Sequence, residues 1–419
     1  MRVFKFGGAS VKDAQSIKNV ARVLDHTGYK NMVVVISAMG KMTNQLEQVV
    51  DTYCNNTDTL KDEFAKVYSF HYEIIRELFP QKSHGIYDLF ASLLNELKDF
   101  IKHNKSTERP FIYDQIVSYG ELFSTHILSA YLNDVGYKNT WLDSRSCIKT
   151  DSNYRDPRVD WNKTQKQISK RVNPKDLTIT QGFLGSETTH NFTTTLGREG
   201  SDYTAAIFAY CLNASEVVIW KDVPGVLNAD PRHFTKTVLL NQVSYREAIE
   251  LAFYGASVIH PKTLQPLQRK EIPLFVRSFL APEGPGTCVG KGKTLDPVVS
   301  CFILKKDQVL VSLSSLDFSF MVEDHIGDVF KWLHQFKMKV ELIQNSAISF
   351  SVCIDNKFNK LPELLKKLRE NFLVEYHENV TLYTVRHATA NEIAKLTKGR
   401  EVLLKQETQE TVQIVINQA

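Results

Sequence analysis

The sequence predicts an α/β fold: a mostly parallel sheet flanked by helices, followed by a ferredoxin-like unit. Strand and helix patterns alternate over roughly the first 280 residues, as in parallel sheets with helices on both faces. A Pro/Gly segment at residues 281–287 can continue neither a strand nor a helix. Beyond it the order changes to βαββα, the ferredoxin-like arrangement.

The composition is that of an ordinary globular protein long enough for two domains. The chain has 419 residues, of which 43% are hydrophobic and 23% charged. The net charge of +4 is spread without blocks of one sign, which does not suggest a nucleic-acid or membrane surface. Six cysteines lack metal-type spacing, and a strand pattern stands where a signal peptide would. We therefore expect free thiols and a cytoplasmic location.

Two strands near the start end in turns of small residues. Residues 1–6 lead into Gly7-Gly8, with a helix from about Asp13, and residues 32–37 lead into Ala38-Met39-Gly40 and a helix near 45–53. The carboxyl ends of parallel strands share one edge of the sheet, where ligands bind. Glycine turns before helices favour phosphate, and Lys5 would add an ammonium there. The alternative is a tight turn with Lys5 in solvent.

The stretch TTLGREGSDYTAA, residues 194–206, places charged and small residues before a helix. Helix N-termini favour anions, and Arg198 suits a carboxylate or phosphate. Asp202 would repel an anion unless it faced a cation, so we expect a zwitterion or a metal-bound phosphate. The alternative is a helix cap formed by Ser201 or Asp202, with Arg198 on the surface.

Helical patterns run from Leu60 to about Val135, with breaks near Pro80 and Pro110. Glu121 lies in the apolar segment 111–132 of this stretch. A glutamate in such a helix either faces solvent or is buried to contact an ammonium group. The pattern leaves both interpretations open.

Further strands are predicted at residues 139–142, 177–181 and 217–220. After the last of these, Asp222 could accept ribose hydroxyls and Arg232 could meet phosphate oxygens, or both could be plain turn residues. His260 precedes a proline and follows two apolar residues. We interpret it as structural rather than as an acid or base.

The C-terminal patterns predict strands separated by short helices. The expected strands are 308–313, 340–343, 348–354, 373–376, 380–385, 401–404 and 412–416, and the expected helices are 324–336, 361–372 and 391–396.

Taken together, the motifs resemble the aspartate kinases (aspartokinases) of the amino-acid kinase superfamily, with C-terminal ACT domains. The resemblance rests on KFGGAS, SAMGKMTN, GEL at 120–122, TQGF at 180–183, TTTLGREGSDYTAA, KDVPGVLNADPR and GASVIHPKT, and it covers about residues 1–290. It implies an amino-acid kinase catalytic domain at 1–290, an ACT-like regulatory domain at 298–378 and a shortened ACT-like unit at 379–419. The ACT resemblance rests on SLSSLDFSF and KVELIQNSAISFSV, and it is weaker in the second unit, which lacks a final helix and strand.

The activity implied is phosphorylation of the β-carboxylate of L-aspartate by ATP and Mg²⁺, the first step of lysine, threonine and methionine biosynthesis. Lys5 and Asp202 would be catalytic, Lys5 stabilising the transferring phosphoryl group. Arg198 would clamp the α-carboxylate, and Glu121 or Asp202 would meet the α-ammonium. The remaining expected residues are Ser37, Thr43 and Ser201 for aspartate, and Gly7, Gly8, Lys221, Asp222, Arg232 and Lys262 for the nucleotide.

Four positions depart from the family pattern: Ala9 for threonine, Glu199 for glycine, Ser257 for lysine and Leu227 for an aromatic residue. The lysine missing at Ser257 normally reaches the nucleotide phosphates. We hypothesise that Lys262 or Lys221 replaces it. Two other functions stay open. One is a superfamily member acting on glutamate, acetylglutamate, carbamate or a nucleotide, and the other is a catalytically silent amino-acid sensor.

The ACT resemblance implies a homodimer with feedback by lysine or threonine at an ACT interface. The segment FMVED, residues 320–324, lacks the glycine-rich turn expected before the first ACT helix. The candidate effector contacts are Ser314, Asp317, Phe318, Glu341, Gln344 and Asn345.

Overall fold

The computed structural model describes residues 1–55, 58–256, 259–317 and 319–417. The predicted effector contact Phe318 and the departure at Ser257 lie outside these ranges. The chain divides into two compact units. The first comprises residues 1–226, 239–249 and 258–296, and the second comprises residues 227–238, 250–257 and 297–419.

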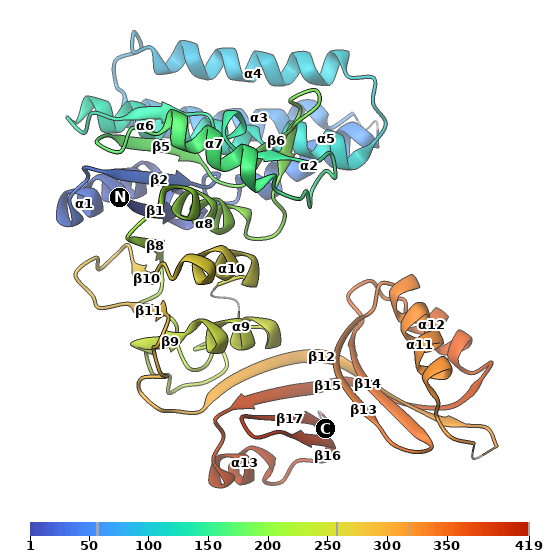
Figure 1. Ribbon diagram of the computed structural model, residues 1–419. Coiled ribbons are helices and arrows are strands. Elements are labelled where there is room, and N and C mark those ends of the chain that lie inside the picture. Colours follow the sequence, from blue (N-terminus) through green and yellow to red (C-terminus); the bar gives the residue numbers. More distant parts are fainter. Residues whose placement is uncertain (56–57, 257–258, 318, 418–419) are drawn as a thin grey trace. The chain divides into compact units, whose positions relative to one another are not determined.

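The first unit is built on an eight-stranded sheet with the order β3-β5-β2-β1-β8-β10-β11-β9 (Figure 1). From β3 to β10 in this order, neighbouring strands are parallel; β11 is antiparallel to β10, and β9 is parallel to β11. The mostly parallel sheet predicted from the sequence is therefore confirmed. The strands are β1 Arg2–Phe6, β2 Met32–Ile36, β3 Thr140–Leu142, β5 Leu177–Gln181, β8 Glu216–Lys221, β9 Gln242–Ser244, β10 Leu274–Ser278 and β11 Thr287–Gly290.

Helices cover both faces of this sheet. Successive side chains of a strand point to opposite faces, and every residue of β2 and β5 is buried, so both faces must be covered. On one face, α1 to α6 share a core with Phe4, Phe6 and Trp220. On the other, α8 packs against β1, β2 and β8, with α7 and α10 beside it. The helices are η1 Gly8–Val11, α1 Ala14–Thr27, α2 Met42–Cys54, α3 Leu60–Leu78, α4 Ile86–His103, α5 Arg109–Val117, α6 Tyr119–Asp134, η2 Ser144–Ser146, α7 Trp161–Arg171, α8 Gly200–Leu212, α9 Tyr245–Tyr254 and α10 Pro261–Lys270.

The long helical stretch expected between Leu60 and Val135 consists of α3, α4, α5 and α6. The sequence patterns did not predict β9, β10, β11 or a small separate sheet, whose strands have only two to five residues. Segments this short show at most about two periods of alternation, so a sequence pattern can predict some of them, such as β3, and miss others. The small sheet consists of β4 Lys149–Thr150, β6 Leu184–Glu187 and β7 Thr193–Thr195, in the order β4-β6-β7.

The turns after β1 and β2 pack against each other. The Gly40 amide donates to the Gly8 carbonyl at 3.0 Å. A β-carbon on Gly8 would lie 2.6 Å from the Gly40 carbonyl oxygen and 2.9 Å from that of Ala38. Only glycine fits at Gly8, so the two strand ends are held side by side at one edge of the sheet.

The second unit contains a six-stranded antiparallel sheet with the order β13-β14-β12-β15-β17-β16 (Figure 1). Helices α11 and α12 share one apolar core with strands of this sheet, and α13 packs near β17. The elements are β12 Cys301–Ser315, α11 Glu323–Gln335, β13 Lys339–Asn345, β14 Ser349–Asp355, α12 Leu361–Leu368, β15 Phe372–Arg386, α13 Ala390–Thr397, β16 Val402–Glu407 and β17 Thr411–Ile416.

Two expectations for this unit need correction. The strands expected at 373–376 and 380–385 are parts of one strand, β15, which pairs with the equally long β12 across irregularities between Lys305 and Leu310. The helix expected to reach Phe372 ends at Leu368. Phe372 begins β15, yet it packs in the same core as Leu364 and Leu368. Its four-residue spacing from Leu368 therefore resembled a further turn of the helix.

No helix in the described part of the chain is long and apolar enough to cross a membrane.

The contact between the strand-end turns can be tested with Gly8→Ala. Because the new methyl group would meet backbone oxygens that cannot move independently, we expect the free energy of unfolding to fall by about 1–3 kcal/mol. Urea denaturation followed by tryptophan fluorescence measures this change. The control is Gly85→Ala, where a β-carbon meets nothing within 4 Å. Equal stability of the two variants would contradict the packing argument.

Candidate active site

One cavity of about 510 Å³ lies in the first unit, at the carboxyl ends of its central strands. Lys5 comes from β1, Ser37 follows β2, Glu121 comes from α6, and Lys221 ends β8. The first residues of α8 line the cavity as well. Of the residues singled out in the sequence, the cavity brings together Lys5, Ser37, Thr43, Glu121, Arg198, Ser201, Asp202 and Lys221.

A buried ion pair joins β1 to α8. Lys5 Nζ lies 2.6 Å from Asp202 Oδ1, and both side chains are at most 10% exposed. Lys221 Nζ lies 3.9 Å from Asp202 Oδ2. Burial opposes ionisation of Asp202, but the positive charges of Lys5 and Lys221 outweigh it, so the pKa of this carboxyl is below its ordinary value. Asp202 is therefore an anion, and it holds the Lys5 ammonium in the cavity.

Glu121 is buried and only partly satisfied. Its side chain accepts one hydrogen bond, at 3.2 Å to Oε1, from the Ala38 amide. Within the described residues, Oε2 has no hydrogen-bond partner. Burial raises the pKa of Glu121 to about 8, although the Ala38 bond and Lys5 lower it in part. A carboxyl in this state gains most from a ligand that brings a positive charge.

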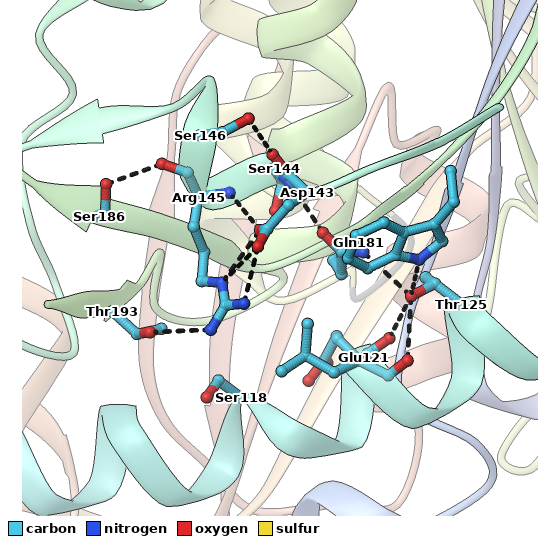
Figure 2. Close-up of polar contacts among 12 residues, drawn as sticks. Ser118, Glu121, Thr125, Asp143, Ser144, Arg145, Ser146, Gln181, Ser186 and Thr193 are labelled. Atoms are coloured by element: carbon cyan, nitrogen blue, oxygen red, sulfur yellow. Dashed lines mark hydrogen bonds and ion pairs between the residues drawn. The ribbon is translucent and has the colours of Figure 1, made fainter. Parts of the chain in front are cut away.

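A polar network fixes the helical turn that carries Glu121 (Figure 2). Thr125 donates its hydroxyl to the Glu121 carbonyl at 2.8 Å. Gln181 Nε2 donates to that hydroxyl at 3.0 Å, and Gln181 Oε1 accepts from the Ser144 amide at 2.8 Å. The turn is thereby tied to β5 and to the segment after β3, which pre-organises Glu121.

The first turn of α8 follows a tightly bent loop. Gly197 and Glu199 both have left-handed backbones, with φ of +76° and +53°. Glu199 is the N-cap residue, and no side chain caps the helix. The capping role considered for Ser201 or Asp202 is therefore wrong, because both lie within the helix. Arg198 is exposed, lines the cavity and forms no ion pair with any described residue.

Several predicted nucleotide residues lie outside this cavity. Gly7 adjoins it, since a β-carbon there would be 3.4 Å from Lys5 Nζ, and Asp222 is exposed just after β8. Lys262 forms an ion pair with Asp156 in the first unit. In the second unit, Arg232 is paired with Asp230 at 2.6 Å.

His260 has the structural role expected from the sequence. Its Nδ1 accepts a hydrogen bond from the Lys262 amide at 3.2 Å, so it caps α10.

The sequence reasoning missed several residues that line the cavity. Residue 113 is brought there by α5, residue 195 by β7, and residues 155 and 183 by loops, and their spacing gave no periodic signal. Glu199 was noted only as a departure from the family pattern. The missed lining residues are Tyr113, Arg155, Phe183, Thr195 and Glu199, whereas Gly197 and Gly200 belong to the loop that the sequence indicated.

The importance of the buried ion pair can be measured with Lys5→Met. Removing the ammonium leaves Asp202 buried with only Lys221 nearby, so we expect the free energy of unfolding to drop by about 3 kcal/mol. The double variant Lys5→Met/Asp202→Asn has no such buried charge and should regain part of this loss. Urea denaturation of both variants gives the comparison. A double variant no more stable than Lys5→Met would show that the pair is not the cause.

Comparison with known proteins places these features in a family. The model of the amino acid kinase family matches residues 1–278. The lysine-sensitive aspartokinase 3 of Escherichia coli (strain K12) is 32% identical over 363 residues, which cover 84% of this chain and 78% of that protein. A bifunctional aspartokinase/homoserine dehydrogenase 2, chloroplastic, from Arabidopsis thaliana is 30% identical over 390 residues. That match covers 88% of this chain but 42% of the larger relative.

Solved structures agree. E. coli aspartokinase III in complex with lysine and aspartate (T-state) has a TM-score of 0.83 and 28% identity, covering 100% of this chain and 96% of the neighbour. The same enzyme in complex with aspartate and ADP (R-state) has a TM-score of 0.81 with the same identity and coverage. With its cavity at the sheet edge and its antiparallel C-terminal sheet, this chain belongs to the amino acid kinase family and, within it, to the aspartokinases.

Proposed function

We propose that this chain transfers the γ-phosphoryl group of ATP to the β-carboxylate of L-aspartate, forming 4-phospho-L-aspartate. The observation that carries the proposal is the composition of the cavity. It combines a buried Lys5–Asp202 pair, a Glu121 oxygen without a hydrogen-bond partner among the described residues, and the unpaired Arg198. These groups match a zwitterionic acceptor next to a phosphoryl group.

The acceptor would be held by its two α-substituents. Arg198 offers a planar pair of donors for the α-carboxylate. Glu121 offers a buried acceptor for the α-ammonium, and Ser37, Thr43 and Ser201 line the same cavity for hydrogen bonding. Held in this way, the β-carboxylate is free to act as the nucleophile.

No general base is required for the transfer, because a carboxylate is already ionised at neutral pH. Catalysis then depends on alignment and on neutralising the charge of the phosphoryl group. Lys5, positioned by Asp202, and Lys221 supply positive charge at the same end of the cavity. Asp202 acts through Lys5 in this scheme.

The nucleotide is assigned to the residues around the strand ends. We propose Gly7 and Gly8 for its phosphates, with contributions from Asp222 and Lys262 of the same unit. Mg²⁺ would be held mainly by the ATP phosphates and water. The described residues contain no cluster of three or more metal-ligating side chains. When bound, Mg²⁺ supplies charge neutralisation on the phosphates.

The second unit is proposed to sense an amino acid, with lysine as the first effector to test, and to form a homodimer. Among the candidate contacts, Asp317, Gln344 and Asn345 are exposed at the ends of β12 and β13. Glu341 is instead buried in ion pairs with Lys305 and Lys339, which makes it the weakest candidate.

The activity can be tested by trapping the acyl phosphate with hydroxylamine in the presence of ATP. We expect hydroxamate from L-aspartate but not from L-glutamate, carbamate or N-acetylglutamate. Lys5→Ala should lower kcat by at least about 100-fold, as expected on removing a group that stabilises the transition state. Product from another acceptor alone would assign a different superfamily activity. Amino-acid binding without any product would identify a silent sensor.

The state of Glu121 predicts a pH dependence of aspartate binding. Below a pKa of about 8 the free enzyme holds Glu121 protonated, and the α-ammonium favours its ionised form. Binding should therefore release a proton at pH 7, and affinity should rise from pH 6 to 8. Calorimetry in buffers of different ionisation enthalpy counts the protons. Glu121→Gln should bind more weakly and abolish the release, whereas unchanged proton release would assign it to another group.

A further inference from the structure

Arg155 is held in a backbone conformation that side chains rarely adopt. Its φ is +72°, in the left-handed region, which costs about 1 kcal/mol for a residue other than glycine. The conformation is imposed by Asp114, a fully buried carboxylate whose Oδ2 accepts from the Arg155 amide at 3.0 Å. Asp114 is itself fixed by the amide and hydroxyl of Thr195, at 2.9 and 2.6 Å. A strained residue held so firmly points to a function for its side chain.

The side chain of Arg155 is also positioned. Its guanidinium carbon lies 4.0 Å from the ring centroid of Tyr113, and the hydroxyl of Tyr113 donates to Glu47 at 2.9 Å. Both Arg155 and Tyr113 line the cavity that holds Arg198. In this stacked contact the flat face of the Arg155 guanidinium lies against the Tyr113 ring. The N–H groups at its edge stay available to donate to a planar anion such as a carboxylate.

The loops of Arg155 and Arg198 touch. A β-carbon on Gly197 would lie 3.0 Å from the Arg155 carbonyl oxygen, so close contact at Gly197 brings the neighbouring Arg198 to the same wall. The sequence separates these two arginines by a helix and three short strands. The pairing is produced by the fold.

Among the described residues, the negative charges of the cavity do not pair with these two guanidiniums. Lys5 and Lys221 face Asp202. In the described part of the chain, neither Arg155 nor Arg198 has a carboxylate within ion-pair distance, although Glu199 lines the same cavity. Two cations at one wall call for a ligand with a negative charge there.

We propose that Arg155 is a substrate-positioning residue that binds the α-carboxylate of the acceptor together with Arg198. This inference rests on the proposed aspartate kinase activity. The α-carboxylate keeps its charge throughout the reaction, whereas the β-carboxylate must leave an oxygen free to attack phosphorus. A clamp of two guanidiniums therefore belongs on the α-carboxylate, where it distinguishes an amino acid with a free α-carboxylate from one without.

The test compares L-aspartate with L-aspartic acid α-amide, which keeps the ammonium and the β-carboxylate but lacks the α-charge. The variant is Arg155→Gly, because glycine accepts the left-handed backbone and should not destabilise the loop. We expect the Kd for L-aspartate, measured by calorimetry, to rise about 10- to 100-fold, as for loss of a charged hydrogen bond. The Kd for the α-amide and the KM for ATP should change less than about twofold.

Two further variants sharpen the comparison. Arg155→Lys keeps the charge but not the planar edge, so it should recover only part of the affinity for L-aspartate. Arg158→Gly removes an exposed arginine of the same loop that does not line the cavity, and it should bind both ligands like the wild type.

Three results would overturn the inference. An equal loss of affinity for L-aspartate and its α-amide would reveal a purely structural role. A rise confined to the KM for ATP would place Arg155 at the nucleotide. Unchanged binding of both ligands would remove it from the site. If the wild type binds L-aspartate but forms no acyl phosphate, the proposed function fails, while the two Kd values still decide the role of Arg155.

Discussion

The buried ion pair between Lys5 and Asp202 is the interaction on which the rest of the site depends. It connects the end of the central strand β1 to the first turn of α8, the two elements that define the cavity. A buried ammonium is costly without an anion, and a buried carboxylate is costly without a cation. Each residue thus makes the burial of the other possible. The pair also leaves a lysine with a fixed position in the cavity, where a phosphoryl group would need it.

Unlike Lys5 and Asp202, the other charged groups of the cavity do not pair with one another in the described part of the chain. Glu121 is buried with an unsatisfied oxygen and a raised pKa, and the two arginines that line the same cavity lack carboxylate partners among the described residues. These groups are not stabilised by one another. A network through Thr125 and Gln181, visible in Figure 2, holds the backbone of Glu121 in place and leaves one oxygen of its carboxyl without a partner among the described residues. Because these side chains are already held in place, a ligand that supplies the missing charges spends little of its binding energy on ordering them.

Three cavity residues have left-handed backbones although they are not glycine: Arg155, Phe183 and Glu199. Of these, Arg155 and Glu199 add a charge that glycine would not. Arg155 is the better anchored, through Asp114 and the ring of Tyr113. Loop residues of this chain thus contribute charged groups to the cavity, although they are not part of the sheet.

The alternation of strands and helices was sufficient to predict the parallel sheet, because each element buries a face with its own period. The resemblance of the ordered motifs to the aspartokinases also implied that Lys5, Glu121, Arg198 and Asp202 would meet in one site. Only the tertiary structure showed that α8 is uncapped by side chains, that β12 and β15 run through the C-terminal sheet, and that Arg155 reaches the cavity. Those outcomes depend on contacts between loops and on pairing along whole strands. The periodic pattern of hydrophobic residues in one segment carries no information about such contacts with distant segments.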